Sequence, residues 1–482
     1  MVARVDRGRG APHSEAAGMT KPSTVGELRQ TGYAPRSVKT EIRQNLIRTL
    51  ERGERIFPGI VGYDETVLPQ LENALLSGQD VILLGERGQA KSRLARALVA
   101  LLDETTPALA GSEVNDDPLQ PISKAGRELL AALGDRAPIE WLSRERRYGE
   151  KLATPDITIA DLIGEVDPIR VAEGRYLSDE LTIHYGLLPR THRGIFVLNE
   201  LPDLAERIQV GLLNIMEERD VQIRGYRVRL PLDLLVVASA NPEDYTNRGR
   251  IITPLKDRFG SQVRTHYPRT LADELGIVLQ EARRFDSDGY EVEVPPYMQE
   301  IVAELTHLCR RSSEISQRSG VSVRVSITNY ENLVSNALRR AVRLREPLAV
   351  PRVSDLPATL ASTAGKIELE AAGDVDDVKI LDRLVQKAVL TVFNRRLQTG
   401  AFAELLEAFG AGLTVEVGEA MPAASYERQA GRAGAIRKAL VELGATGHPV
   451  RVAAGMEFVL EGLHLNRKLN KDRAAGGLRY RA

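Results

Sequence analysis

The sequence predicts an α/β domain built on a parallel sheet, followed by a helical region. Three apolar runs, at residues 81–84, 194–198 and 232–238, have the composition of strands that are buried on both faces. The first run stops at a glycine-rich turn, and leucines and alanines at helical spacing follow it, which is how a βαβ unit opens. After Pro268 the apolar residues repeat with a helical period through Leu344.

The first half of the chain is expected to hold a tail and the α/β domain. Residues 1–37 are predicted to be a disordered tail, because their N-terminal part is rich in Arg, Gly, Pro and Ser. The α/β domain is expected over 38–268, with a poorly patterned insertion at about 107–147 in which Trp141 is a packing anchor. Its further elements are expected to be helices at 38–52, 65–76 and 208–216 and a hairpin at 221–230.

The second half is expected to hold two helical parts. A helical domain is predicted over 269–346 and a mostly helical extension, rich in Ala and Leu, over 347–482. Three prolines, Pro347, Pro351 and Pro357, indicate a linker between the two parts.

Composition excludes several classes of protein. The 65 Lys and Arg residues against 66 Asp and Glu residues leave a net charge of −1, so the basic excess of a nucleic-acid coat protein is absent. The sequence lacks an apolar run of the ~18–20 residues that a membrane span needs, and its N-terminus lacks the apolar core of a secretory signal. We therefore expect a cytoplasmic protein without a membrane or nucleic-acid partner, in which the single Cys309 is buried as a small apolar side chain.

The turn after the first strand has the pattern of a phosphate-binding loop. In such a loop, backbone N–H groups surround the phosphates, a lysine reaches the β- and γ-phosphates, and a hydroxyl residue binds Mg²⁺. Ala90 stands where the general pattern has its last glycine, and a plain glycine turn with a solvated lysine is the alternative interpretation. The candidate nucleotide-binding residues are Gly85, Glu86, Arg87, Gly88, Gln89, Ala90, Lys91 and Ser92.

The second strand ends in Asn199 and Glu200, where a nucleotide-hydrolysing enzyme needs acidic residues. Glu200 is the candidate base that polarises the attacking water, and a solvent-facing acid after a core strand is the alternative. Asn199 stands where an aspartate is expected beside the metal. It can accept a hydrogen bond from a metal-bound water but carries no charge, so we expect it and Ser92 to hold Mg²⁺ less tightly.

Two more polar residues follow the third strand. Asn241 is placed to orient water or contact the γ-phosphate, although a turn-forming Asn-Pro pair explains it as well. Arg258, near the end of the α/β domain, has the delocalised charge that suits a phosphate in its transition state.

Together these residues resemble a family, the AAA+ ATPases, in the branch of the MoxR proteins and the magnesium-chelatase I subunits. The resemblance is carried by Ile60-Val61-Gly62, the loop with alanine before Lys91, the strand ending in Glu200, Ala-Asn-Pro-Glu-Asp at 240–244 and Leu-Lys-Asp-Arg-Phe at 255–259. Residues 185–195 and 212–231 are similar to the helix-2 insertion and the pre-sensor hairpin of that branch. The resemblance covers about residues 41–345 and fades beyond them.

The resemblance implies a three-layer P-loop ATPase domain with a helical lid, and ATP and Mg²⁺ as cofactors. It implies that Ile60 and Val61 contact the nucleotide, that Asn241 is the sensor-1 residue and that Arg324 is the sensor-2 arginine, although a surface arginine at a helix start is the alternative for Arg324. Arg258 becomes an arginine finger acting on the adjacent subunit of a ring, most often a hexamer. A separate protein with a von Willebrand A domain is the implied partner.

The leading functional prediction is therefore an ATP-hydrolysing motor that remodels or activates a partner protein or assists metal insertion. A hydrolysis-impaired scaffold that ATP assembles, and the motor subunit of a tetrapyrrole chelatase, are alternatives that the sequence leaves open. An activator of an alternative sigma factor is disfavoured, because the Gly-Ala-Phe-Thr-Gly-Ala loop of such activators is missing.

Overall fold

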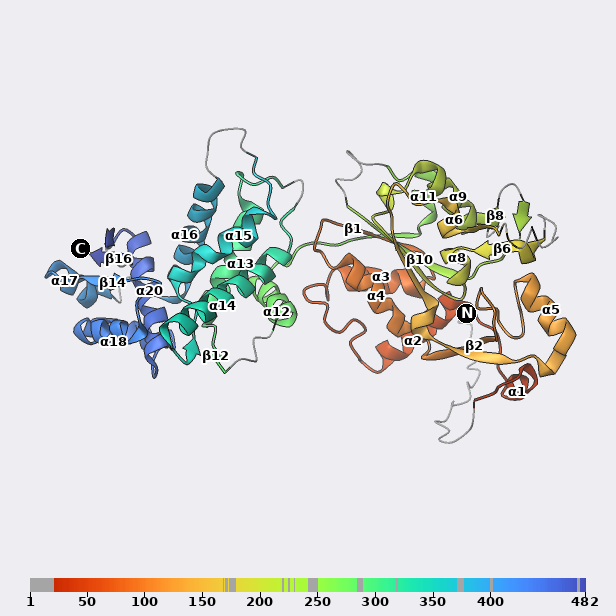
Figure 1. Cartoon of the computed structure of the whole chain (residues 1–482), viewed down its shortest axis with the longest axis horizontal. Helices are drawn as coiled ribbons and strands as arrows, with labels where there is room; N and C mark the ends of the chain where they lie inside the picture. The colour runs from red at the N-terminus through yellow and green to blue at the C-terminus, as the bar shows by residue number, and fades with distance from the viewer. Residues whose placement is uncertain are drawn as a thin grey trace, which may run out of the picture.

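The computed structural model describes residues 21–482 with gaps at 168, 170–171, 173–178, 219–220, 224–225, 229, 242–249, 284–288, 318–319, 371–376, 399–401 and 475–476. The chain forms two lobes side by side, an α/β lobe from the N-terminal half and a helical lobe from the C-terminal half (Figure 1). A short stretch after β11 (Ser261–Arg264) leads from the first lobe into α12 (Leu271–Glu281) of the second.

The α/β lobe is organised by a five-stranded parallel sheet in the order β11-β1-β10-β7-β4. Its central strands, β1 (Val81–Leu84), β10 (Leu234–Ala240) and β7 (Gly194–Asn199), are buried along their whole length. They confirm the three predicted strands. Because all five strands run in the same direction, their carboxyl ends meet at one edge, where ligands bind in folds of this type.

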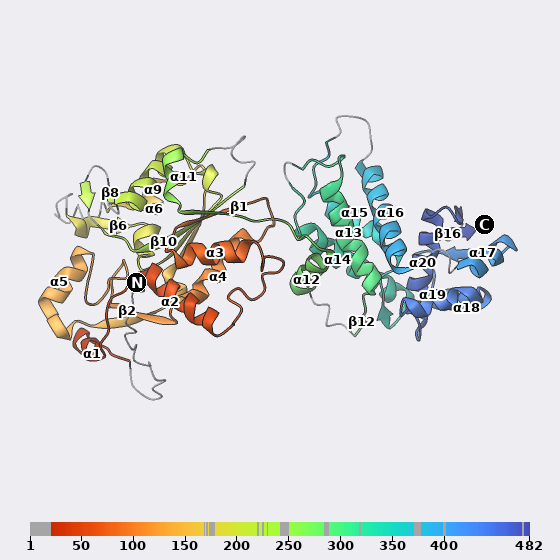
Figure 2. The ribbon, with the colours of Figure 1, turned by 180° about the vertical axis from the view of Figure 1, so that it is seen from behind.

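Helices cover both faces of this sheet and make the three layers. One face packs on α2 (Val38–Glu51), α3 (Val67–Leu76) and α4 (Lys91–Ala97), and the other on α6 (Ile159–Leu162), α8 (Leu187–Arg190), α9 (Glu206–Glu218) and α11 (Thr253–Arg258). Alternate strand residues serve the two cores: Val81 and Leu83 lie in one, Ile82 and Leu84 in the other. Figure 2 shows the two helical layers from behind. The predicted α/β P-loop fold is thereby confirmed.

The two outer strands were not predicted. They are β11 and β4 (Tyr148–Leu152), which pair with β1 and β7. Their sequences, Ser-Gln-Val-Arg and Tyr-Gly-Glu-Lys-Leu, are mostly polar, because each strand has only one neighbour in the sheet and part of it faces solvent.

The prediction of disorder up to residue 37 is wrong for residues 21–37, whereas residues 1–20 lie outside the described part of the chain. Thr24 caps α1 (Val25–Gln30), whose Val25 and Leu28 are fully buried. They pack on the insertion, which forms β2 (Thr105–Leu109), α5 (Lys124–Leu133) and β3 (Ile139–Ser143). Trp141 packs in this small core and donates from Nε1 to the Pro22 carbonyl at 2.9 Å, so it is a packing anchor as predicted.

Three short pairs of strands complete the α/β lobe and its border. Two are antiparallel pairs, β5 with β6 and β8 with β9, and the third, β12 with β13, is a parallel pair that joins segments of the helical lobe. Their bounds are Gly164–Val166, Ile183–Tyr185, Val221–Ile223, Tyr226–Val228, Glu291–Val292 and Leu348–Ala349.

The helical lobe has a single hydrophobic core that runs from Tyr297 to Tyr480. The predicted linker at the three prolines is wrong, because Arg352 and Asp355 between them are fully buried and the helices on either side share this core. Cys309 lies in the same core, fully buried and unpaired, as expected. The remaining elements are α13 (Pro296–Arg311), α14 (Arg324–Leu344), α15 (Thr359–Ala364), α16 (Asp377–Arg396), α17 (Ala403–Gly410), α18 (Ala423–Arg432), α19 (Arg437–Glu442), α20 (Pro449–Leu465) and the sheet β14-β16-β15 (Val415–Val417, Gly477–Arg481, Asn470–Ala474).

No helix in the described ranges is long and apolar enough to cross a membrane.

Candidate active site

The loop between β1 and α4 contains glycine at positions where a larger side chain would not fit. A Cβ on Gly85 would lie 1.9 Å from Thr265 Oγ1 and 2.2 Å from Gln89 Oε1. Gln89 closes the loop, because its Oε1 accepts from the Glu86 N–H at 3.0 Å and from Thr265 Oγ1 at 2.8 Å. Gly88 has φ of +76°, a left-handed conformation that favours glycine. These contacts make the cradle that a phosphate-binding loop needs.

Ala90 stands at the N-terminus of α4 in a left-handed conformation, with φ 55° and ψ 17°. An L-residue with a Cβ is strained there, by roughly 1–2 kcal/mol. This strain shows the cost of having alanine where the general loop pattern has glycine.

Replacing Ala90 with glycine is expected to raise the free energy of unfolding by up to about 1 kcal/mol, because the left-handed strain disappears while the unfolded chain gains some freedom. Urea denaturation measures the change. The matched control is Ala131→Gly in the exposed last turn of α5, where the backbone is not left-handed and the same substitution should cost up to about 1 kcal/mol. Equal destabilisation by both variants would contradict the strain at Ala90.

Lys91, Asn241 and Glu200 form one chain of hydrogen bonds across the carboxyl edge of the sheet. Lys91 Nζ donates to Asn241 Oδ1 at 2.5 Å, to the Glu86 carbonyl at 2.9 Å and to the Gly85 carbonyl. Asn241 Nδ2 donates to Glu200 Oε2 at 2.8 Å. Glu200 has φ of +56°, so it is a second strained residue at this edge. The structure thus brings together the predicted lysine, the predicted base and the predicted sensor.

Ser92 and Asn199 face each other beside this chain. Ser92 Oγ donates to Asn199 Oδ1 at 3.4 Å, and Ser239 Oγ donates to the same oxygen at 3.2 Å. Within the described residues, no group of three or more His, Cys, Asp or Glu could hold a metal ion. Mg²⁺ is bound in nucleotide sites through few protein ligands together with water and phosphate, so a hydroxyl and an amide oxygen fit it.

Sequence reasoning missed a carboxylate at the same place. Glu150 of β4 accepts from Asn199 Nδ2 at 2.6 Å and from Arg96 of α4 at 2.8 and 2.9 Å. The Arg96 guanidinium, with help from the hydroxyl of Tyr148 and the amide of Asn199, lowers the pKa of Glu150 against the effect of its partial burial. No local motif marks Glu150, because its role depends on how β4 pairs with β7.

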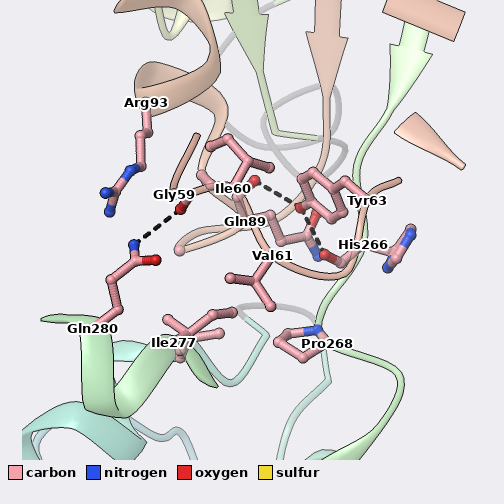
Figure 3. A pocket seen from close by; sticks show the side chains of 13 residues that line it. Gly59, Ile60, Val61, Tyr63, Gln89, Arg93, His266, Pro268, Ile277 and Gln280 are labelled. Carbon is pink, nitrogen blue, oxygen red and sulfur yellow. Dashed lines mark hydrogen bonds between the residues drawn. The ribbon is translucent and has the colours of Figure 1, made fainter. Parts of the chain in front are cut away.

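Ile60 and Val61 line a pocket between the α/β lobe and α12. Figure 3 shows both side chains at the pocket, with Pro268 and Ile277 opposite them. Gln280 of α12 donates to the Gly59 carbonyl at 2.9 Å. This mostly apolar space beside Gln89 and Ala90 has the character of a site for a flat heterocycle attached to the phosphates.

Tyr63, another residue that the sequence did not single out, holds this pocket together. Its hydroxyl lies 2.9 Å from the Gln89 carbonyl and 2.8 Å from the His266 carbonyl, and its ring meets that of His266 edge to face. Burial raises the pKa of Tyr63 to about 12, so the hydroxyl keeps its proton and donates. Tyr63 therefore ties the phosphate loop to the end of β11.

The two predicted arginines lie away from the Lys91 chain. Arg258 is at the end of α11, half exposed, and pairs with Glu217 of α9. Arg324 is exposed at the start of α14, but its neighbour Ser322 reaches the loop: a Cβ on Gly88 would lie 1.9 Å from Ser322 Oγ. Arg324 is thus close in sequence to a residue that touches the loop, and Arg258 is exposed on the surface of the α/β lobe.

Comparisons with known proteins point to one family. Residues 173–258, which include Asn199, Glu200, Asn241 and Arg258, match the model of the Sigma-54 interaction domain. The chain is 28% identical over 265 residues to the magnesium-chelatase subunit ChlI of Nostoc sp., covering 54% of this chain and 65% of the relative. It is 30% identical over 247 residues to the magnesium-chelatase 38 kDa subunit of Acidiphilium rubrum, covering 48% and 65%.

Among solved structures, a complex between subunits BchI and BchD of magnesium chelatase is similar at 20% identity, covering 68% of this chain and 98% of that one with a TM-score of 0.35. The chain spans less than two thirds of the length of both curated relatives. The parallel sheet, the P-loop cradle and these sequence relatives support an AAA+ ATPase similar to the magnesium-chelatase I subunits.

Proposed function

We propose that this protein is a Mg²⁺-dependent ATPase that assembles into a ring and uses ATP hydrolysis to remodel or activate a partner protein. The observation that carries the proposal is the hydrogen-bonded chain from Lys91 through Asn241 to Glu200, beside Ser92 and Asn199. Hydrogen bonds through Asn241, the proposed sensor, thus link the lysine that would bind phosphate to the proposed base.

Each residue then has a defined task. ATP binding draws Lys91 from the carbonyls of Gly85 and Glu86 to the phosphates, while the backbone of the loop and the N-terminus of α4 surround them. Glu200 accepts a proton from the attacking water, and Asn241 orients Glu200. Ser92 and Asn199 would hold Mg²⁺, which neutralises charge on the phosphates when bound.

The proposal extends to the neighbouring subunit. Arg258 is proposed as the arginine finger that acts on ATP bound by the next subunit, and Arg324 as the lid arginine that contacts the γ-phosphate. The outward position of Arg258 and the contact of Ser322 with the phosphate loop support these roles. A hexameric ring follows from the family resemblance.

Nucleotide binding and ring assembly test the proposal together. With a fluorescent ATP analogue, the wild-type chain is expected to bind and mass photometry is expected to show a larger assembly, whereas Lys91→Ala should lose at least 10-fold in affinity because it removes a charged hydrogen-bond donor to phosphate. Lys387→Ala, an exposed lysine of α16, is the matched control and should behave as wild type. Equal binding by the Lys91 and Lys387 variants would overturn the proposal.

A second candidate is a scaffold that ATP assembles without hydrolysis. Asn199, which leaves the metal position without its usual carboxylate, is the observation that favours it. If the protein is a scaffold, wild type should assemble with ATP but release no phosphate. If it is a motor, wild type should assemble with ATP and also release phosphate.

The partner is proposed from the resemblance. Relatives in this branch work with a separate protein that bears a von Willebrand A domain, and the relatives named above are subunits of magnesium chelatases. We propose a partner protein of that kind. Insertion of a metal into a tetrapyrrole is the alternative reaction that the motor would drive. We also propose a reducing compartment, which suits the free, buried Cys309.

A further inference from the structure

The side chain of Asn199 is held at both ends of its amide. Its Oδ1 accepts from Ser92 Oγ and Ser239 Oγ, and its Nδ2 donates to Glu150 Oε1 at 2.6 Å. Only 8% of the residue is exposed. Because Asn199 joins α4, β10 and β4 in this way, its orientation is a property of three neighbouring elements.

Glu150 decides which way this amide faces. The two ends of an asparagine amide are alike in shape, so the hydrogen-bond partners determine where the oxygen lies. The Ser92 and Ser239 hydroxyls can donate or accept, so they suit either end. An ionised carboxylate accepts only, which requires the NH₂ group to face Glu150 and the oxygen to face Ser92.

Glu150 is itself held in place. Arg96, one turn along α4 from Ser92, donates to both carboxylate oxygens at 2.8 and 2.9 Å, and the Tyr148 hydroxyl donates to Oε2 at 2.9 Å. The side chain of Glu150 is 19% exposed. Since Arg96 balances the charge of Glu150, this carboxylate orients the Asn199 amide but adds little net charge to the metal position.

We propose that Glu150 is a positioning residue that points the Asn199 oxygen at the magnesium position, so that Asn199 and Glu150 together replace the single aspartate expected there. This inference rests on the proposed function, because it assigns a task in binding Mg²⁺ with nucleotide. It also explains the residue at 199: an aspartate there would set two carboxylates about one hydrogen bond apart, and like charges at that distance repel.

The consequence for substitutions has an unexpected sign. Asn199→Asp restores the usual residue type but is expected to weaken the site, because the new carboxylate faces Glu150. Combining it with Glu150→Gln removes the repulsion and supplies an amide NH₂ group that can donate to the new carboxylate. The pair of substitutions is therefore expected to recover what the single one loses.

The test measures the affinity for a fluorescent ADP analogue with Mg²⁺ and with EDTA. The ratio of the two affinities is the Mg²⁺ effect. Removal of groups that orient a metal ligand typically costs 10–100-fold in metal affinity, so Glu150→Ala and Asn199→Asp should each lose about 10-fold of the Mg²⁺ effect. Glu150→Gln should keep most of it, because the Gln oxygen still accepts from Asn199, and Asn199→Asp with Glu150→Gln should equal or exceed wild type.

A control and the stability of the variants keep the test decisive. Glu416→Gln removes a carboxylate paired with Arg479 in the C-terminal sheet and should leave the Mg²⁺ effect unchanged. In urea denaturation, Asn199→Asp should be less stable than the double variant Asn199→Asp with Glu150→Gln. This comparison tests the contact between residues 150 and 199 without nucleotide. If wild type binds with a Mg²⁺ effect that Glu150→Ala retains in full, or if Asn199→Asp alone exceeds wild type, the inference is overturned while the proposed function stands. If wild type binds no nucleotide, both are overturned.

Discussion

Replacing Glu200 with glutamine is expected to lower ATP turnover by a factor of about 10²–10⁴, the usual contribution of a general base, while ATP binding is retained. Glutamine has the size of glutamate and can still accept from Asn241 Nδ2, so the hydrogen-bonded chain to Lys91 survives. The amide cannot take a proton from water. Phosphate release at saturating ATP and the affinity for a fluorescent ATP analogue separate the two effects.

The matched control for this variant is Glu206→Gln, an exposed glutamate in the first turn of α9 close to Glu200 in sequence. It should hydrolyse ATP as wild type does. If Glu200→Gln turns over ATP at the rate of this control, Glu200 is not the base, and the proposed catalytic role of the residue that follows β7 has to be abandoned.

Replacing Asp355 with asparagine is expected to lower the free energy of unfolding of the helical lobe by roughly 3–5 kcal/mol, the cost of breaking a buried ion pair. Asp355 is fully buried, accepts from Arg340 at 2.9 Å and 3.3 Å and from the Arg352 N–H at 2.7 Å. Among the described residues, the neutral variant leaves the buried Arg340 guanidinium with Glu346, 3.6 Å away, as an ion-pair partner.

The single tryptophan allows unfolding of the two lobes to be followed separately. Trp141 lies in the α/β lobe, so its fluorescence reports that lobe. Circular dichroism is dominated by helices, and the larger part of the described helical residues, α12 to α20, belongs to the helical lobe. In urea, Asp355→Asn should move the dichroism transition to lower concentration more than the fluorescence transition. Arg383→Ala, which breaks the exposed pair of Arg383 and Glu314, is the control and should cost less than ~1 kcal/mol. An unchanged dichroism midpoint in Asp355→Asn would contradict the shared core.

The central strands and the phosphate loop could be predicted because their signals are local. β1 is a continuous apolar run, β7 and β10 are apolar except for Asn199 and Ser239 near their ends, and the loop with Lys91 lies within eight consecutive residues. The outer strands β4 and β11 lack such runs, since only part of each faces the core.

The errors of prediction arise where long-range contacts override local pattern. Three prolines indicate a linker, but the segment between them is buried. Asp355 accepts from Arg340, 15 positions away, and Arg352 donates to the Met421 carbonyl, 69 positions away. Likewise, no residue near Val25 in the sequence indicates a partner for it, because Val25 packs on the antiparallel pair β2-β3, about 80 residues or more downstream. Such pairings are set by the fold as a whole.

The candidate site divides in the same way. Lys91, Glu200 and Asn241 were predicted from where they follow strands, and their meeting at one edge is a consequence of parallel strand direction. Glu150 could not be predicted, because its bond to Asn199 joins residues 49 positions apart through the pairing of β4 with β7. Tyr63 escaped for the same reason, since its partner His266 is 203 positions away.

We propose that this chain hydrolyses ATP, and phosphate release by purified wild type with ATP, once with Mg²⁺ and once with EDTA, tests this claim. We expect steady release with Mg²⁺ that falls to background with EDTA and in Lys91→Ala. Release that stays at background with Mg²⁺, under conditions where the nucleotide is bound, would contradict the claim.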